Sequence, residues 1–149
     1  MRGAYIWLGR LIALGVLLQA MWIAFGFFTV AHRIDDGTTF DKDYVENTSI
    51  FGLDMHGLFG MMIIPALGLL FLIVSFFAKV PGGAKWAGLT FLAIVLQVTF
   101  AFVAFGVPVV GLLHGLNAFV VLGLGAYAAR RAQTLGTAQQ ATAPAAATV

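Results

Sequence analysis

Residues 50–78 read IFGLDMHGLFGMMIIPALGLLFLIVSFFA, and only Asp54 and His56 in this stretch are ionisable. A helix that crosses a bilayer needs about 20 mostly apolar residues. The stretch exceeds that length. It therefore predicts a membrane-spanning helix over Ile50–Ala78, with one histidine placed inside the membrane.

Three further stretches have the same character: Tyr5–Ala31, Lys85–Val107 and Pro108–Ala129. The chain is 61% hydrophobic and 9% charged, whereas soluble domains are about half apolar and about one-quarter charged. We therefore predict an all-α integral membrane protein, an up-down-up-down four-helix bundle over residues 1–131. Residues 132–149 are rich in Ala, Thr and Gln and are predicted to form a disordered cytoplasmic tail. Because the chain has no cysteine, disulfides, thiolate metal sites and covalent c-type haem attachment are excluded.

The distribution of charge predicts the orientation in the membrane. Basic residues flank one end of the four spans: Arg2, Arg10, Lys79, Lys85, Arg130 and Arg131. The other end has only Arg33 and Lys42, among five acidic residues of the 32–49 loop. We expect both termini in the cytoplasm of a bacterial-type plasma membrane. The net charge of only +2 gives no reason to expect a nucleic-acid partner; the expected partner is the lipid bilayer.

The two halves of the chain resemble each other. The segment Leu18–Trp22, LQAMW, is similar to Leu96–Phe100, LQVTF, and the tripeptide His-Gly-Leu occurs at His56 and again at His114. This pattern indicates a duplicated helical hairpin, with the two halves related by an axis along the membrane normal.

His56 and His114 each lie about two turns into a helix that runs inward from the outer face. In an up-down-up-down bundle these two helices are diagonal neighbours. Ionisable groups inside a membrane are costly and usually functional. The pair therefore predicts one haem b bound between them, with His56 and His114 as the ligands of the metal.

Small residues on the faces of the two histidines would make space for the porphyrin: Gly52, Gly60, Gly111, Gly115 and Ala118. The alternative is that small residues simply allow helices to pack closely in lipid. Arg33, just beyond the first span, is the expected partner of the haem propionates. Gln19 and Gln97 would either fix the tautomers of the histidines or join helix to helix.

Other metals fit the sequence less well. Zinc prefers about four ligands, and Asp54 lies two residues from His56, on a different helix face. Copper would have to recruit methionine from Met55, Met61 or Met62, whose spacing indicates no site.

A four-helix unit with histidines on its second and fourth helices resembles one half of haem A synthase, and also other membrane b-type cytochromes. The resemblance implies haem binding at His56 and His114. The synthases carry Glu-x-x-His-Arg at the second-helix ligand, whereas this chain has Leu53 at the Glu position and Gly57 at the Arg position. Asp54 is a shifted carboxylate.

These observations lead to three hypotheses. The first is a bis-histidine haem b protein that transfers electrons or serves as a subunit of a respiratory complex. Quinol or other membrane redox subunits would be its partners, in a homo- or hetero-oligomer. The second is an enzyme or chaperone of haem metabolism related to haem A synthase. The third is a structural subunit without a cofactor, whose histidines are hydrogen-bonded in the core.

Overall fold

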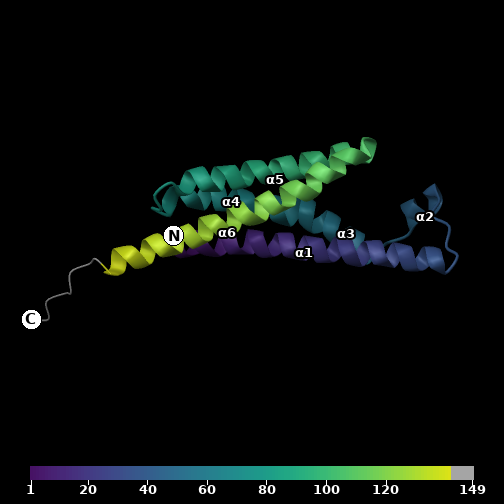
Figure 1. Ribbon diagram of the computed structural model, residues 1–149, viewed down its shortest axis with the longest axis horizontal. Helices are drawn as coiled ribbons and strands as arrows, with labels where there is room; N and C mark the ends of the chain where they lie inside the picture. Colours follow the sequence, from purple (N-terminus) through teal and green to yellow (C-terminus); the bar gives the residue numbers. More distant parts are fainter. Residues whose placement is uncertain (142–149) are drawn as a thin grey trace, which may run out of the picture.

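The computed structural model describes residues 1–141, and that part of the chain is helical, with no strand (Figure 1). Its elements, in chain order, are α1 (Arg2–Asp35), α2 (Lys42–Asn47), α3 (Phe51–Leu58), the π-helical turn η1 (Phe59–Ile63), α4 (Ile64–Phe77), α5 (Gly83–Gly106), the 3₁₀ turn η2 (Pro108–Val110) and α6 (Gly111–Ala141).

Within the described residues, four helical segments are long and apolar enough to cross a membrane. They are Arg2–Asp35, Phe51–Phe77, Gly83–Gly106 and Pro108–Ala138. The prediction of four apolar helices of membrane-spanning length is therefore confirmed. The second and third predicted spans agree with these segments closely at both ends. The first segment is slightly longer than predicted at both ends, and the last continues from the predicted end at Ala129 to Ala138.

The four long segments pack in a ring. Helix α1 packs against α3 and α4 on one side and against α6 on the other, and α5 packs against α4 and α6. The second and fourth segments consequently lie diagonally opposite each other. Each of them carries one of the two histidines, so these side chains can meet across the centre of the ring.

The hydrophobic core lies in the half of the molecule nearest the turn between α4 and α5. Its largest fully buried side chains are Tyr5, Ile12, Phe71, Ile94 and Val121. The Tyr5 hydroxyl donates a hydrogen bond of 3.0 Å to the Gly83 carbonyl and so ties α1 to the start of α5. The interior is therefore closed at this end.

The second long segment is not a regular α-helix. In the turn η1 the Ile64 N–H donates to the Phe59 carbonyl, five residues back. Pro65 follows directly and has no N–H to give; its ring would also clash with the carbonyl four residues earlier. A widened turn relieves that clash, and such turns occur often at functional sites.

The connection between the first and second spans contains more helix than expected. Helix α1 continues to Asp35, and the short helix α2 begins at an N-cap, since the Asp41 carboxylate accepts a bond of 2.8 Å from the Tyr44 N–H. An acidic N-cap of this kind satisfies one of the free N–H groups at a helix start.

Residues 132–141 belong to the predicted tail, and the structure continues α6 through them. Ala132 is fully buried, and Gln133 accepts a bond of 2.7 Å from Arg10 of α1. Ala, Leu and Gln favour helix, and the small Ala132 side chain lets α6 pack closely where it leaves the predicted span. Residues 142–149 of the predicted tail lie outside the described part of the chain.

Candidate functional site

The rings of His56 and His114 lie next to each other, with centroids 6.2 Å apart and planes inclined at 63°. His56 is in α3 and His114 is in α6, so the two residues reach the same point from opposite corners of the ring of helices. Both side chains are half-buried. The approach expected from their matched depth is observed.

His56 is held by a reciprocal pair of hydrogen bonds to Gln19 of α1. Its Nδ1 lies 3.1 Å from the Gln19 main-chain carbonyl, and the Gln19 side-chain amide donates to the His56 carbonyl at 3.0 Å. A carbonyl oxygen only accepts, so Nδ1 must carry the hydrogen in this bond. The lone pair of the neutral ring is then on Nε2, the nitrogen that would bind a metal.

His114 makes the same two bonds with Gln97 of α5. Its Nδ1 lies 3.0 Å from the Gln97 carbonyl, and the Gln97 amide donates to the His114 carbonyl at 2.9 Å. The similarity between the two hairpins in sequence thus corresponds to the same interaction made twice. The main-chain carbonyl of each glutamine, and not its side chain, accepts the hydrogen bond from the histidine Nδ1.

The two pairs differ in what surrounds the glutamine. Asn117 donates to the Gln97 side-chain oxygen at 2.7 Å and to the Ala93 carbonyl at 2.8 Å. The position equivalent to Asn117 in the first hairpin is Phe59, which cannot donate. Among the described residues, the side-chain oxygen of Gln19 and the indole N–H of Trp22 are buried without a hydrogen-bond partner.

Asn117→Leu should destabilise the protein by about 1 kcal/mol, because polar contacts between membrane helices average roughly 0.6 and reach about 1.7 kcal/mol. The variant leaves the Gln97 oxygen without its donor. Reversible unfolding in mixed detergent micelles measures the effect. Thr99→Val is the control, since Thr99 is exposed and its hydroxyl bonds only to the Val95 carbonyl of its own helix; equal losses in both variants would contradict the role given to Asn117.

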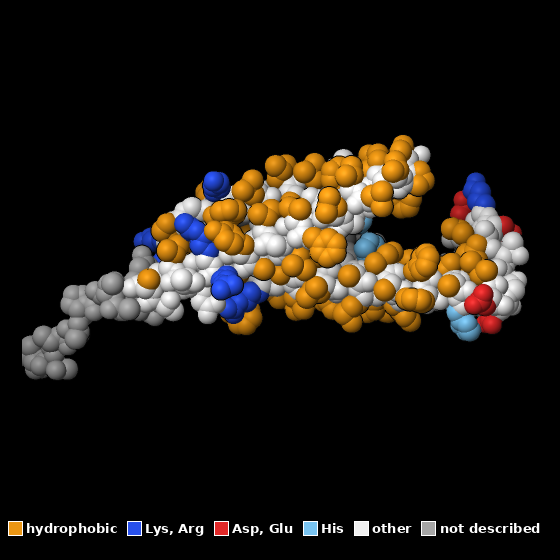
Figure 2. Space-filling view, viewed as in Figure 1, with side chains coloured by type: hydrophobic (Ala, Val, Ile, Leu, Met, Phe, Trp, Pro, Cys, Tyr) orange, Lys and Arg blue, Asp and Glu red, His pale blue; other side chains and the backbone are white. Residues whose placement is uncertain are grey.

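The two hairpins separate beyond the histidine pair. Figure 2 shows an open notch between the tip of the α5–α6 hairpin and the far part of α1, with histidine side chains at its closed end. At that tip large apolar side chains are exposed, among them Phe102, Phe105, Leu112 and Leu113. The histidines therefore stand where the packed core ends and the notch begins.

The predicted groove residues fall into two groups. A Cβ on Gly52 would lie 2.7 Å from both the Gly26 Cα and the Trp22 carbonyl, and one on Gly60 would lie 2.6 Å from the Gln19 amide nitrogen. These two glycines face α1, so close helix packing explains them.

The other group lies on α6 beside His114. A Cβ on Gly115 would meet nothing within 4 Å, and one on Gly111 would meet only the Ala104 Cβ, at 4.0 Å. Ala118 is half-buried on the same helix. The two glycines of α6 therefore border open space, whereas the two of the second span are packed against α1.

The structure places the residues of the outer loop away from the rings. Arg33 donates a bond of 2.9 Å to the Tyr44 hydroxyl and follows Gln19 by fourteen residues of the same helix, which corresponds to about 21 Å along its axis. His32 forms an exposed pair with Asp36 at 3.5 Å. Neither residue is brought to the histidine pair.

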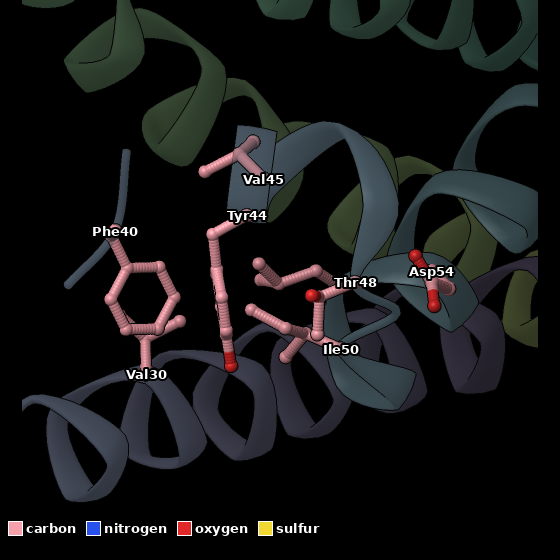
Figure 3. A pocket seen from close by; sticks show the side chains of 8 residues that line it. Val30, Phe40, Tyr44, Val45, Thr48, Ile50 and Asp54 are labelled. Carbon is pink, nitrogen blue, oxygen red and sulfur yellow. The ribbon is translucent and has the colours of Figure 1, made fainter. Parts of the chain in front are cut away.

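Asp54 borders a separate cavity of about 180 Å³ between α1, α2 and α3 (Figure 3). Its carboxylate accepts a hydrogen bond from the Ser49 hydroxyl, and Tyr44, Thr48 and Ile50 line the same cavity. Asp54 thus belongs to a different face of α3 from His56, as its spacing indicated.

The described residues contain no group of three or more His, Cys, Asp or Glu side chains that would hold a metal ion by themselves. Of the three methionines weighed for copper, Met61 and Met62 are 47% and 62% exposed, and Met55 is half-buried. The nitrogens of the two histidines are the metal-binding groups that the fold brings together.

No known protein family matches the chain, and neither a curated protein nor a solved structure matches it. The function must therefore be argued from the geometry of the site.

Proposed function

We propose that the protein is a membrane haem b protein in which His56 and His114 are the two axial ligands and whose work is electron transfer. The observation that carries the proposal is the pair of facing imidazoles, 6.2 Å apart, each with its Nδ1 hydrogen-bonded to a main-chain carbonyl. Metal-binding histidines commonly donate their second nitrogen in this way, which fixes the ring and its tautomer.

The separation suits two ligands on one iron. With a metal–nitrogen bond of about 2.0–2.1 Å and a ring centre roughly 1 Å behind each nitrogen, two imidazoles on opposite sides of one metal have centres about 6 Å apart. Any inclination between the ring planes is compatible with that arrangement. Packed aromatic side chains also make edge contacts at this spacing. What favours ligation is that both Nδ1 atoms bond to main-chain carbonyls, which leaves each Nε2 lone pair for a metal.

The surroundings also favour a large flat group. The notch begins at the histidines, and Gly111 and Gly115 border open space on the α6 side. The buried N–H of Trp22 has no partner among the described residues, and it lies one turn beyond Gln19 toward the notch. We assign to this indole, in place of the distant Arg33, the hydrogen bond to a haem carboxylate.

In this proposal the four long helices cross the membrane as an up-down-up-down bundle, with both termini in the cytoplasm and the notch at the outer face. The charge distribution supports this orientation. With both axial positions occupied by histidine, the iron would change oxidation state without binding a substrate, and the protein contributes the ligands and their orientation. The electrons would be exchanged with quinol or with another membrane redox subunit.

Absorbance spectroscopy of the detergent-purified protein tests the proposal. We expect a Soret band and sharp reduced α and β bands of low-spin haem b, about one haem per chain, and little change when carbon monoxide is added. A colourless protein after expression with ample haem supply would refute the proposal and favour a structural subunit. Extraction of a chemically altered haem would instead favour an enzyme of haem metabolism.

The orientation predicts a separate result. A single cysteine introduced at Asp36 or Asp43, in the otherwise cysteine-free chain, should react with a membrane-impermeant maleimide in intact cells. A cysteine at Thr134 should react only after the cells are opened. The reverse pattern would place the notch on the cytoplasmic side.

A further inference from the structure

The basic end of the molecule has no acidic side chain to balance it. All six Asp and Glu residues of the chain lie between positions 35 and 54. The two side-chain ion pairs of the described residues, His32–Asp36 and Lys42–Glu46, lie at that same acidic end. The positive charges of Lys79, Lys85, Arg130 and Arg131 therefore lie at an end of the molecule without acidic side chains.

Two of these charges border an open, shallow cavity of about 280 Å³ on the surface of α6. Its wall consists of Tyr127, Arg130, Arg131, Thr134 and Leu135, which recur three and four residues apart and so share one face of the helix. Leu135 and Thr134 belong to the part of α6 that extends beyond the predicted span, so the cavity exists only because the helix continues.

Neighbouring groups show that the cavity lies beside the turn between α4 and α5, at the level of a pair of aromatic rings. Arg131 donates a bond of 2.5 Å to the Pro81 carbonyl, which holds its guanidinium beside the turn between α4 and α5. Tyr127 packs edge-on against Trp86, with ring centroids 4.6 Å apart, and Lys85 lies 5.6 Å from the centre of the Trp86 ring. Aromatic rings of this kind are typical of the level of the lipid headgroups.

We propose that this cavity binds the phosphate headgroup of an anionic phospholipid of the inner leaflet. Guanidinium groups suit phosphate because they offer several N–H donors in one plane. The Tyr127 hydroxyl adds a hydrogen-bond donor for the headgroup, whereas the Thr134 hydroxyl already donates to the Arg130 carbonyl. The exposed apolar surface of α6 on the membrane side of Tyr127 borders the acyl chains. Basic pockets on the cytoplasmic side of membrane helices are a known mode of recognition of acidic lipids.

The test compares the full-length protein in nanodiscs of phosphatidylcholine with and without phosphatidylglycerol, and counts retained lipid by native mass spectrometry. We expect preferential retention of phosphatidylglycerol. Each arginine near a membrane surface is worth roughly a factor of five in affinity, so Arg130→Gln with Arg131→Gln should lower the retention by about 25-fold.

Arg33→Gln, which removes an arginine at the opposite end, is the matched control and should leave the retention unchanged. Arg130→Gln alone, which spares the bond from Arg131 to Pro81, should lower it about fivefold in a protein of unaltered helix content. Equal retention of the two lipids, or equal loss in the Arg33 variant, would overturn the proposal. Displacement of the lipid by millimolar inorganic phosphate would also overturn it, since the site would then select the free anion. These outcomes do not depend on whether haem is bound.

Discussion

His56→Ala and His114→Ala should each abolish the low-spin haem spectrum, the largest change expected from any single substitution. Each variant removes one of the two ligands and, with it, the bond from the histidine Nδ1 to the glutamine carbonyl. Loss of an outer partner of a metal ligand already costs about 10–100-fold in affinity, and loss of the ligand itself should cost more. The α-band absorbance per chain after purification measures the effect.

His32→Ala is the control, since His32 is exposed and paired only with Asp36. It should keep the full spectrum. Retention of a normal spectrum in either His56→Ala or His114→Ala would show that the facing imidazoles are not the ligands. His56→Met separates ligation from packing: it should fill the space and keep the fold while shifting the spectrum, because a thioether replaces an imidazole on the iron.

Gly52→Ala should lower the stability of the fold by about 1–3 kcal/mol, the usual cost of overpacking, and Gly52→Leu should prevent folding. The added Cβ would lie 2.7 Å from the Gly26 Cα, so main chain meets main chain and no side chain can move aside. Reversible unfolding in mixed micelles measures the loss for the alanine variant. The yield of monodisperse protein reports on the leucine variant.

Gly88→Ala is the matched control in α5, because a Cβ there would meet nothing within 4 Å. It should be neutral or slightly stabilising, since alanine favours helix over glycine by up to about 1 kcal/mol. If Gly52→Ala were equally harmless, α1 and α3 would not cross at Gly26 and Gly52. Gly52 would then be interpreted again as a residue that makes space for the porphyrin.

The number of long apolar helices and the meeting of His56 with His114 could be predicted from the sequence, because both depend on length and on position along a helix. The direction in which a small residue faces could not be predicted from the sequence. In lipid the outward surface is as apolar as the core, so the pattern around Gly52 and Gly60 does not distinguish a face turned to α1 from one turned to an open groove. The close contacts of Gly52 with Gly26 and of Gly60 with Gln19 show that both glycines face α1.

Two other features depended on contacts distant in sequence. The bond from Arg10 to Gln133 and the burial of Ala132 extend α6, and neither follows from the composition of the tail. The equivalence of Gln19 and Gln97 in the two hairpins could be predicted from the sequence, which left open whether they contact the histidines or join helix to helix. Which atom of each residue meets the histidine depends on the rotation of the helices about their axes, and this is set by tertiary packing.

The π-turn η1 has a consequence for how the second span tolerates change. An α-helix turns by about 100° per residue, so the one additional residue accommodated between Phe59 and Ile63 sets the angular phase of α3 relative to α4. With α4 anchored through the buried Phe71, shortening this turn by one residue would swing His56 through about a quarter of a revolution, away from His114. The second hairpin reaches His114 through the turn at Pro108 and has no such adjustment. The two histidines therefore converge by different backbone paths, and the alignment of the pair depends on residue count in η1 as much as on side-chain identity.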